Sequence, residues 1–424
     1  MSKILFFVFL ISISSRTIFL PFKRNFFEEL NSTNLMSQLY ENNIYIILKV
    51  GTPIQEVPLY LKLNQYPSFI LTRNENAKFN ENKSSTFQFL EKSYSLYHFY
   101  DFFHGILSSD RIQFDTNNTI DNFTFILSKK LKDKNMKFSG EIGLDIQSKY
   151  PDKIDITNFI DQLKKINFTD NYSFSLKYTN QDEGFFIFGN YLHNYDKQYN
   201  ENDFLFDELS YYKNKMIKWS FSFDELYSGT QILEFENENK TFVELSYEVG
   251  LIIGSTPYLY YIQDNFLTNN YCNQQKLKGK LYLIYYECPG NINIKQFPEI
   301  KFVNKNLKFN FTLNYKDLFL KYDNKYYFLI AFSEVYQGFF TFGAPFLRKY
   351  QIFLDKDKKI FGIYPQKENK QFNLLSYTFI FISLLIIFIF IIIIFVKSFS
   401  NKNLKRKLRA NELNYDYEYA ETIN

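Results

Sequence analysis

The sequence is poor in cysteine and histidine. Among its 424 residues it has two cysteines, Cys272 and Cys288, and three histidines. No other metal-ligating residues cluster with the two cysteines, so we expect no metal site. Acidic and basic residues nearly balance, giving a net charge of +4. Because a nucleic-acid-binding surface is strongly basic, we expect no nucleic-acid partner, and no sequence feature predicts a cofactor.

The first fifteen residues have the pattern of a signal peptide. Lys3 precedes an apolar run over residues 4–13, and the small residues Ser14 and Ser15 follow it. We therefore expect a signal peptide over residues 1–15, cleaved near Ser15. A signal anchor is the alternative, but the run is too short to span a bilayer. The chain is thus expected to enter the secretory pathway.

A second apolar run lies near the other end, over residues 374–396. Its length fits one transmembrane helix, and a buried core helix is the less favoured alternative. Basic residues follow it from Lys397 to Arg409. Because positive residues favour the cytosolic side, residues 397–424 are predicted to be a cytosolic tail. We expect a single-pass type I membrane protein, endolysosomal or at the cell surface.

Between these runs the sequence indicates an all-β body. Short apolar runs alternate with polar residues and are separated by turn residues. The clearest expected strands are residues 44–50, 172–178, 184–189 and 338–343. One helix is also expected, because four apolar residues recur at helical spacing. They are Ile156, Phe159, Ile160 and Leu163. Asp155 or Thr157 is the expected helix cap.

Two stretches organise the body. In each, an apolar strand, a sharp loop and a second apolar strand follow one another, over residues 60–72 and 243–254. These stretches resemble the two active-site loops of the pepsin-like aspartic proteases. In that family each lobe presents the motif Asp-Thr-Gly between two such strands.

Both aspartates of that motif are missing here. Asn64 and Ser246 stand at the matching positions, and Tyr66 and Glu248 replace the two glycines. Glycine sits where backbone must approach closely or take a positive φ angle. We therefore expect Tyr66 and Glu248 to reshape the floor of the cleft.

Further motifs of the family follow between residues 45 and 365. Residues 84–87 form a Ser-Ser-Thr-Phe segment, and residues 98–110 are similar to the flap hairpin that closes over substrate. Two segments, 141–143 and 341–343, resemble the family's apolar-apolar-Gly. Residues 159–163 match a Phe-x-Asp-Gln-Leu helix, and residues 343–350 match the closing Leu-Arg segment. His98 falls where the family has its flap tyrosine, with Tyr100 beside it. Its titration would make binding pH-sensitive in an acidic compartment, but an ordinary surface or packing histidine is the favoured interpretation.

The resemblance implies the fold and its boundaries. We expect an all-β, bilobal pepsin-like aspartic protease fold with a few short helices, plus one C-terminal transmembrane helix. Residues 44–190 would form the N-terminal lobe and 191–366 the C-terminal lobe, after a pro-segment-like or N-terminal strand region at 16–43. The second lobe of the family carries a disulfide in the region of Cys272 and Cys288. Such a bridge would contribute about 3 kcal/mol of stability in an oxidising compartment.

The substitutions predict an inactive peptidase. In the family, two carboxylates share one proton, so that one activates water while the other donates to the peptide carbonyl. Neither Asn64 nor Ser246 can accept a proton near neutral pH. We therefore expect a catalytically inactive homologue whose cleft binds a peptide or protein ligand through the flap and strand edges.

Two alternatives stay open. One is an active aspartic-type endopeptidase whose acids lie elsewhere, with Asp101, Glu244 and Glu248 close enough in sequence to be considered. However, no acidic residue lies between Glu56 and Glu75, so a small shift cannot build a symmetric pair. The other alternative is a structural or adhesive surface protein, which would tolerate a filled cleft.

Glycosylation sequons are frequent and all precede the expected membrane span. Because the chain is rich in asparagine, many of them arise by chance, and we interpret them as permitted sites. They lie at Asn31, Asn82, Asn117, Asn122, Asn167, Asn171, Asn239 and Asn310.

Overall fold

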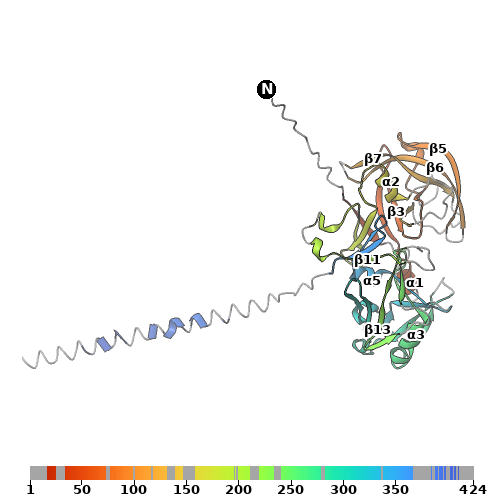
Figure 1. Cartoon of the computed structure of the whole chain (residues 1–424). Coiled ribbons are helices and arrows are strands. Elements are labelled where there is room, and N and C mark those ends of the chain that lie inside the picture. The colour runs from red at the N-terminus through yellow and green to blue at the C-terminus, as the bar shows by residue number, and fades with distance from the viewer. Residues whose placement is uncertain are drawn as a thin grey trace, which may run out of the picture. The chain divides into compact units, whose positions relative to one another are not determined.

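Figure 1 shows the computed structural model of the chain. It describes residues 17–24, 34–72, 77–98, 101–115, 118–130, 139–146, 158–194, 196, 199–210, 219–233, 240–277, 282–335, 338–365 and isolated positions from 383 to 409. For residues 96–98, 101–103 and 129–130 it describes the backbone alone. Residues 1–365 form one compact unit and residues 366–424 a second.

The expected signal peptide lies outside the described residues, as does most of the apolar run 374–396. Across the positions that are described, no helix is both long and apolar enough to cross a membrane.

The first unit is built mainly from strands, as the sequence predicts. Within the described residues the largest sheet has thirteen strands, in the order β11-β26-β25-β9-β10-β1-β2-β3-β8-β4-β7-β6-β5. They are β1 (Ile18–Arg24), β2 (Ile44–Val50), β3 (Gln55–Lys62), β4 (Phe69–Leu71), β5 (Gln88–His98), β6 (Asp101–Gln113), β7 (Thr119–Lys130), β8 (Gly140–Gly143), β9 (Ser173–Tyr178), β10 (Glu183–Phe188), β11 (Leu205–Glu208), β25 (Ile352–Asp355) and β26 (Ile360–Ile363).

Two smaller sheets complete the second half of the unit. One has the order β12-β15-β24-β16-β23-β18-β22-β21, with β17 paired to β18, and the other has the order β14-β13-β19-β20. Their strands are β12 (Ser220–Phe223), β13 (Glu225–Ser228), β14 (Gln231–Leu233), β15 (Thr241–Leu245), β16 (Ile252–Gly254), β17 (Asn273–Lys276), β18 (Leu283–Pro289), β19 (Ile300–Asn304), β20 (Phe309–Leu313), β21 (Phe319–Tyr322), β22 (Lys325–Phe328), β23 (Ile330–Ser333) and β24 (Phe340–Phe342).

The helices are short. The α-helices are α1 (Leu35–Tyr40), α2 (Phe159–Lys165), α3 (Thr256–Ile262), α4 (Tyr315–Leu318) and α5 (Ala344–Lys349). Single turns of other helix types lie at η1 (Glu81–Lys83), η2 (Leu192–Asn194), η3 (Glu201–Asp203), η4 (Gln263–Leu267) and η5 (Ile294–Gln296). In Figure 1, β5, β6 and β7 lie at one end of the unit, and β13 and α3 lie at the other.

The N-cap of helix α2 is not one of the two residues expected from the sequence. Its N-cap is Asn158, whose side-chain oxygen accepts a hydrogen bond from the Asp161 amide at 2.8 Å. Asn158 also donates through its side-chain amide to the Asp145 carbonyl at 3.0 Å and to the Tyr172 hydroxyl. The expected caps, Asp155 and Thr157, lie outside the described residues, and the prediction was wrong because Asn158 fills this role.

Residues 16–43, expected as a pro-segment or an N-terminal strand, contribute β1 and α1. Strand β1 lies between β10 and β2 and is antiparallel to both. Its residues alternate between buried and exposed from Ile18 to Arg24. Because side chains of a strand point to opposite faces in turn, Arg24 lies on the same core-facing side as Phe22.

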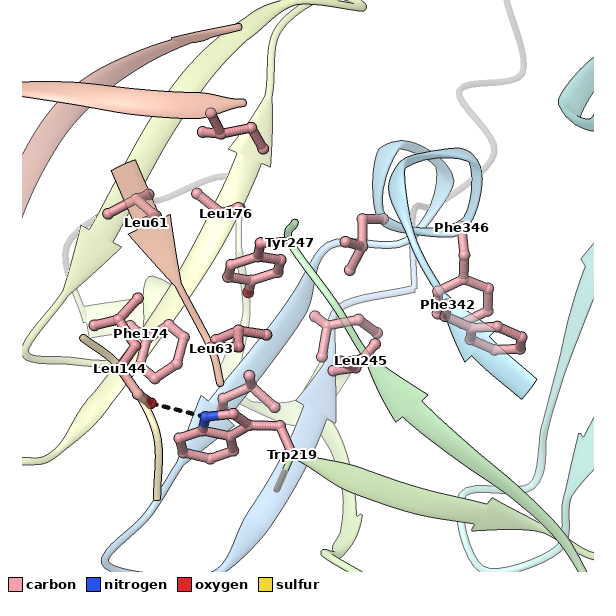
Figure 2. Packing of buried hydrophobic residues seen from close by; sticks show 14 of the residues in the cluster. Leu61, Leu63, Leu144, Phe174, Leu176, Trp219, Leu245, Tyr247, Phe342 and Phe346 are labelled. Atoms are coloured by element: carbon pink, nitrogen blue, oxygen red, sulfur yellow. Dashed lines mark hydrogen bonds between the residues drawn. The ribbon is translucent and has the colours of Figure 1, made fainter. Parts of the chain in front are cut away.

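The core behind the expected active-site loops joins the two halves of the unit. Figure 2 shows the indole of Trp219, just before β12, with its Nε1 donating to the Leu144 carbonyl just after β8, at 2.9 Å. The Trp219 ring is fully buried and meets the Phe174 ring edge-on at 5.2 Å. The same buried cluster contains aliphatic and aromatic side chains from both halves, among them Leu61, Leu63, Leu245, Tyr247 and Phe342.

The predicted disulfide is confirmed. Cys272 and Cys288 are bonded to each other. Cys272 directly precedes β17 and Cys288 lies in β18, so the bridge ties the two strands of one hairpin together.

Replacing Trp219 by phenylalanine tests the junction between the halves. The buried Leu144 carbonyl would lose its shorter hydrogen bond and keep a long one from the Tyr172 hydroxyl at 3.5 Å. This loss costs about 1–3 kcal/mol of unfolding free energy, and the smaller ring adds to it. Urea unfolding followed by circular dichroism measures the difference. Phe206→Leu is the control, because Phe206 is 58% exposed and its change should stay within about 0.5 kcal/mol. Equal effects of both substitutions would contradict the role given to Trp219.

Candidate functional site

The first expected loop is held by strands on both of its sides. Strand β3 runs parallel to β8, with Tyr60 opposite Glu141. Strand β4 runs antiparallel to β8, with Phe69 opposite the same Glu141. The loop between β3 and β4 therefore crosses the end of β8.

The second loop has the same construction. Strand β15 runs parallel to β24, with Glu244 opposite Thr341. Strand β16 runs antiparallel to β24, with Ile253 opposite the same Thr341. Segment 141–143 thus lies within β8, and segment 341–343 covers the end of β24 and Gly343 after it. Strands β8 and β24 each lie between the two strands that flank a loop.

The registers fix which loop residues correspond. In both halves the two residues that share one partner lie nine positions apart in the sequence, Tyr60 and Phe69 in the first and Glu244 and Ile253 in the second. Asn64 follows Tyr60 at the same distance at which Glu248 follows Glu244, so Asn64 and Glu248 occupy equivalent positions in the two loops.

This correspondence differs from the pairing of Asn64 with Ser246 that we expected from the sequence. By the registers, Ser246 corresponds to Lys62. A sequence signal for the Glu248 pairing was present: Glu248-Val249-Gly250 keeps an acidic residue and a glycine at the spacing of Asp-Thr-Gly.

The Glu248 side chain connects the two loops. Its Oε1 accepts hydrogen bonds from the backbone amide of Leu63 at 2.7 Å and, more weakly, from that of Asn64 at 3.4 Å. Its Oε2 accepts from the Ser246 hydroxyl at 2.8 Å. Hydrogen bonds to an ionised acceptor are about twice as strong as neutral ones. The carboxylate therefore holds the first loop against the second.

The other acids considered from the sequence lie elsewhere. Asp101 begins β6 and pairs with His98 in the β5–β6 hairpin, and Glu244 lies within β15. Of these three acids, Glu248 is the one located in a loop between paired strands.

A buried ion pair underlies the first loop. The Lys62 ammonium lies 4.0 Å from Oε1 of Glu141, and the two side chains are 12% and 1% exposed. The second half has Ser246 and Thr341 at the equivalent positions. The two loops therefore differ in charge although their backbones are built alike.

Tyr66 is held against helix α2. Its hydroxyl donates to Oδ2 of Asp161 at 3.2 Å, and the Lys356 ammonium contacts the same oxygen at 2.9 Å. Burial and the neighbouring Asp161 carboxylate raise the pKa of Tyr66 well above its usual value, so it stays neutral. This side chain thus ties the first loop to α2 and to the turn between β25 and β26.

The N-terminal segment packs against the second loop. The Gly250 amide donates to the Tyr40 carbonyl at 2.8 Å, and the Asn42 amide donates to the Glu248 carbonyl at 3.0 Å. A Cβ atom on Gly250 would lie 1.8 Å from the Leu39 carbonyl oxygen. Glycine is therefore required here by the close approach of α1.

The flap hairpin expected at residues 98–110 is longer in the structure and comprises β5 and β6, so that the expected residues cover the end of β5 and most of β6. Its strands pair from Gln88 and Ser109 as far as His98 and Asp101. The structure describes the backbone of His98, and Tyr100 lies outside the described residues.

Five of the eight sequons fall on described residues. Asn82, Asn122, Asn167 and Asn310 are exposed and Asn171 is half-buried. Asn31, Asn117 and Asn239 lie outside the described part of the chain. Among the residues whose side chains are described, no three His, Cys, Asp or Glu side chains are grouped so that they could hold a metal.

Replacing Glu248 by alanine should destabilise the protein. The Leu63 amide and the Ser246 hydroxyl would lose a charged acceptor, at a cost of about 1.5–3 kcal/mol. Glu248→Gln should cost less, because its side-chain oxygen can still accept from Leu63. Chemical unfolding measures both, with Glu208→Ala as the control since Glu208 is exposed. A loss for Glu248→Ala no larger than that of the control would disprove the connection between the loops.

A comparison with curated proteins found no match. The family model described as eukaryotic aspartyl protease matches residues 66–365, well over half of the chain. The matched region includes Glu248, β8 and β24, and the disulfide. It begins two residues after Asn64. The mostly β body, the paired strand–loop–strand units and this match agree, and the chain belongs to the eukaryotic aspartyl protease family.

Proposed function

We propose that this protein is a membrane-anchored, catalytically inactive member of its family that binds a peptide or protein ligand without cutting it. The proposal rests on the contact between the loop after β3 and the loop after β15, which we call the loop junction. Among the described residues of the two loops, 63–68 and 246–251, Glu248 is the one acid, and both of its carboxylate oxygens accept hydrogen bonds from the loops themselves. Asn64 stands at the equivalent position of the other loop.

Peptide hydrolysis by this fold needs two groups that exchange protons. One carboxylate removes a proton from water and the other donates to the substrate carbonyl. Asn64 can do neither, because an amide is not basic and does not ionise. Each positioned acid or base contributes about 10²–10⁴-fold in rate, and groups that act as a unit fail together. A lone Glu248 therefore predicts negligible turnover.

Ligand binding does not depend on these proton transfers. Strand β5 stands at one end of the thirteen-stranded sheet, and in the described part of the chain no further strand pairs with its outer edge. Such an edge offers main-chain donors and acceptors to an extended peptide. Phe89 on this strand is 48% exposed, which adds an apolar contact for a ligand side chain.

The alternative of an active endopeptidase also has an observation in its favour. Glu248 lies opposite Asn64, and an amide can stabilise the charge that develops on a carbonyl oxygen during attack by water. In that case Glu248 would act as the base. The third candidate, a structural or adhesive protein, requires neither cleavage nor peptide binding.

Peptide cleavage and binding assays separate the three functions. The full-length chain would be incubated with a diverse peptide library from acidic to neutral pH, with and without a statine-type inhibitor. We expect no cleavage but retained binding of peptide or inhibitor. Asn64→Asp provides the matched variant, because it places a second carboxylate opposite Glu248, and any cleavage should appear in this variant first.

Inhibitor-sensitive cleavage by the unmodified chain would overturn the proposal. If Glu248→Gln then abolished that cleavage while Glu208→Gln did not, Glu248 would be the base of an active enzyme. A folded protein that neither cleaves nor binds would favour the structural or adhesive function.

Membrane anchoring is the second part of the proposal. The apolar run 374–396 and the basic residues after it support one span with a cytosolic tail. The disulfide and the exposed sequons fit a body made in the secretory pathway. We place the protein at the cell surface or in endolysosomal membranes.

Alkaline extraction of membranes tests the anchor. The full chain should stay in the membrane pellet, whereas a chain ending at Pro365 should be released into the medium. Glycosidase treatment should increase the mobility of both on a gel. Full extraction of the intact chain by alkali would rule out a membrane span.

A further inference from the structure

One side of the thirteen-stranded sheet carries exposed apolar side chains on four neighbouring strands. Strands β10, β1, β2 and β3 lie next to one another in that order. Phe19 is 45% exposed, Ile47 47% and Phe185 38%, and Pro21 and Pro58 are also accessible. We call these five residues the apolar face. Single exposed apolar residues are common on protein surfaces, but a contiguous group of them marks a surface that contacts a partner or a membrane.

The strand registers place these side chains side by side. Phe185 pairs with Pro21, and Ile47 pairs with Pro58. Strands β1 and β2 are antiparallel and pair through the residues next to Pro21 and Ile47, so these two follow in the same register. Phe19 lies two residues before Pro21 and therefore points to the same side of the sheet. The apolar face thus crosses four strands without interruption.

The other side of the sheet packs beneath the loop junction. On β9, Lys177 pairs with Phe185 and shares its side of the sheet, whereas Phe174 points to the opposite side because side chains alternate along a strand. The Phe174 ring lies 6.4 Å from the Tyr247 ring, and both belong to the buried cluster that contains Leu63. Figure 2 shows these three side chains together. The apolar face therefore looks away from the loop junction.

The surroundings of the apolar face suit a neutral apolar partner. Lys23 lies 3.1 Å from Glu183, and Lys177 lies 3.9 Å from Asp196. Because each lysine has an acidic partner, neither leaves an unbalanced positive charge for an anionic partner. Among the five sequons on described residues, none lies on β10, β1, β2 or β3. Glycans at those sequons would not arise from these strands.

The strand that ends the first unit belongs to the same sheet. Strand β26 is separated from β10 by β25 and β9. Neighbouring strands lie about 4.8 Å apart, so β26 and β10 are about 15 Å apart. On the other side of β26, Phe206 of β11 pairs with Gly362 and is 58% exposed. The registers across β26, β25 and β9 put Phe206 on the same side of the sheet as Phe185. Exposed apolar side chains thus lie on both sides of the last strand.

The length of chain after the first unit limits how far it can lie from a membrane. Residues 366–373 separate the unit from the apolar run 374–396. At about 3.6 Å per residue, these residues span at most about 30 Å. A tether this short gives the apolar face a high effective concentration at the lipid surface once the run is inserted. Contacts too weak to hold a free protein are then sufficient.

We propose that the apolar face rests on the lipid surface and that the loop junction points away from it. The proposal depends on the membrane anchor of the proposed function. Apolar side chains such as Phe and Ile bind at the boundary between headgroups and acyl chains. Because the neighbouring charges are paired, the face suits a zwitterionic lipid such as phosphatidylcholine. A ligand would then reach the loop junction from the aqueous side, without passing the membrane surface.

Fluorescence quenching by lipids tests this contact. The two native cysteines are bonded to each other, so in Ile47→Cys the introduced residue is the reactive thiol. The full-length variant, labelled there with nitrobenzoxadiazole, would be reconstituted into phosphatidylcholine vesicles with and without nitroxide-labelled lipid. We expect several-fold stronger quenching than in Ile232→Cys labelled in the same way. Ile232 is the matched control, because it is 51% exposed and lies in β14 of another sheet.

Substitutions in the apolar face should weaken the quenching. Phe19→Ser combined with Phe185→Ser should bring the quenching of the Ile47 label close to that of the Ile232 control. Phe89→Ser should leave it unchanged, because Phe89 is similarly exposed but lies on β5 at the far end of the sheet. Quenching at Ile47 that is no stronger than at Ile232 would overturn the proposal. A disulfide formed between two unlabelled Ile47→Cys chains would overturn it as well, since a second copy would then cover the face.

Alkaline extraction of the same vesicles separates failure of this contact from failure of the anchor. A chain that stays with the lipid but shows no quenching at Ile47 would disprove the contact and leave the anchor intact. A chain that alkali releases would disprove both.

Photoactivated cross-linking of the unmodified chain tests the contact without any substitution. Phosphatidylcholine with a diazirine near its headgroup should form adducts in the peptides that contain Ile47 and Phe185, as found by mass spectrometry. Adducts in the run 374–396 provide the control for reconstitution. Their presence without adducts at Ile47 or Phe185 would contradict the proposal.

Discussion

The hydrogen bond from the Leu63 amide to the Glu248 carboxylate joins the two loops around which the whole unit is arranged. Each loop is fixed by its own centre strand, β8 or β24, but these strands belong to different sheets. The contact across the junction is therefore what sets one loop against the other. A carboxylate suits this task because it accepts from several donors at once.

Further contacts hold the two loops in their positions. Trp219 and Leu144 join the halves through one buried hydrogen bond, and Tyr66 ties the first loop to α2. The N-terminal segment covers the second loop through Tyr40 and Asn42. Because the chain runs from β1 through α1 into β2, the segment that covers the loop is also part of the main sheet. A change in that segment would thus reach the loops through the backbone, without any contact with a ligand.

The sequence predicted the features that depend on local pattern. Strand 44–50 followed from alternation and matches β2, and the disulfide pair followed from the family resemblance. The helix cap could not be chosen from sequence, because several residues of suitable type stand together and contacts of Asn158 with distant residues decide among them. The correspondence of Asn64 with Glu248 depends on strand registers with β8 and β24, whose residues are distant in the sequence. The burial of the Arg24 side chain could not be predicted either, because nothing in the sequence indicates that α5 packs near it.

The order of the thirteen-stranded sheet has a consequence for how the protein is made. Strand β9, near the middle of the chain, pairs on one side with β10 and on the other with β25, whose residues begin at Ile352. During synthesis from the N-terminus, β9 therefore keeps an unpaired edge until the last strands of the unit have emerged from the ribosome. Pairings between residues so distant in sequence form slowly, and exposed strand edges favour aggregation. The sheet is thus completed shortly before the apolar run 374–396 is made, and chaperones that shield strand edges would protect β9 between the synthesis of β9 and that of β25.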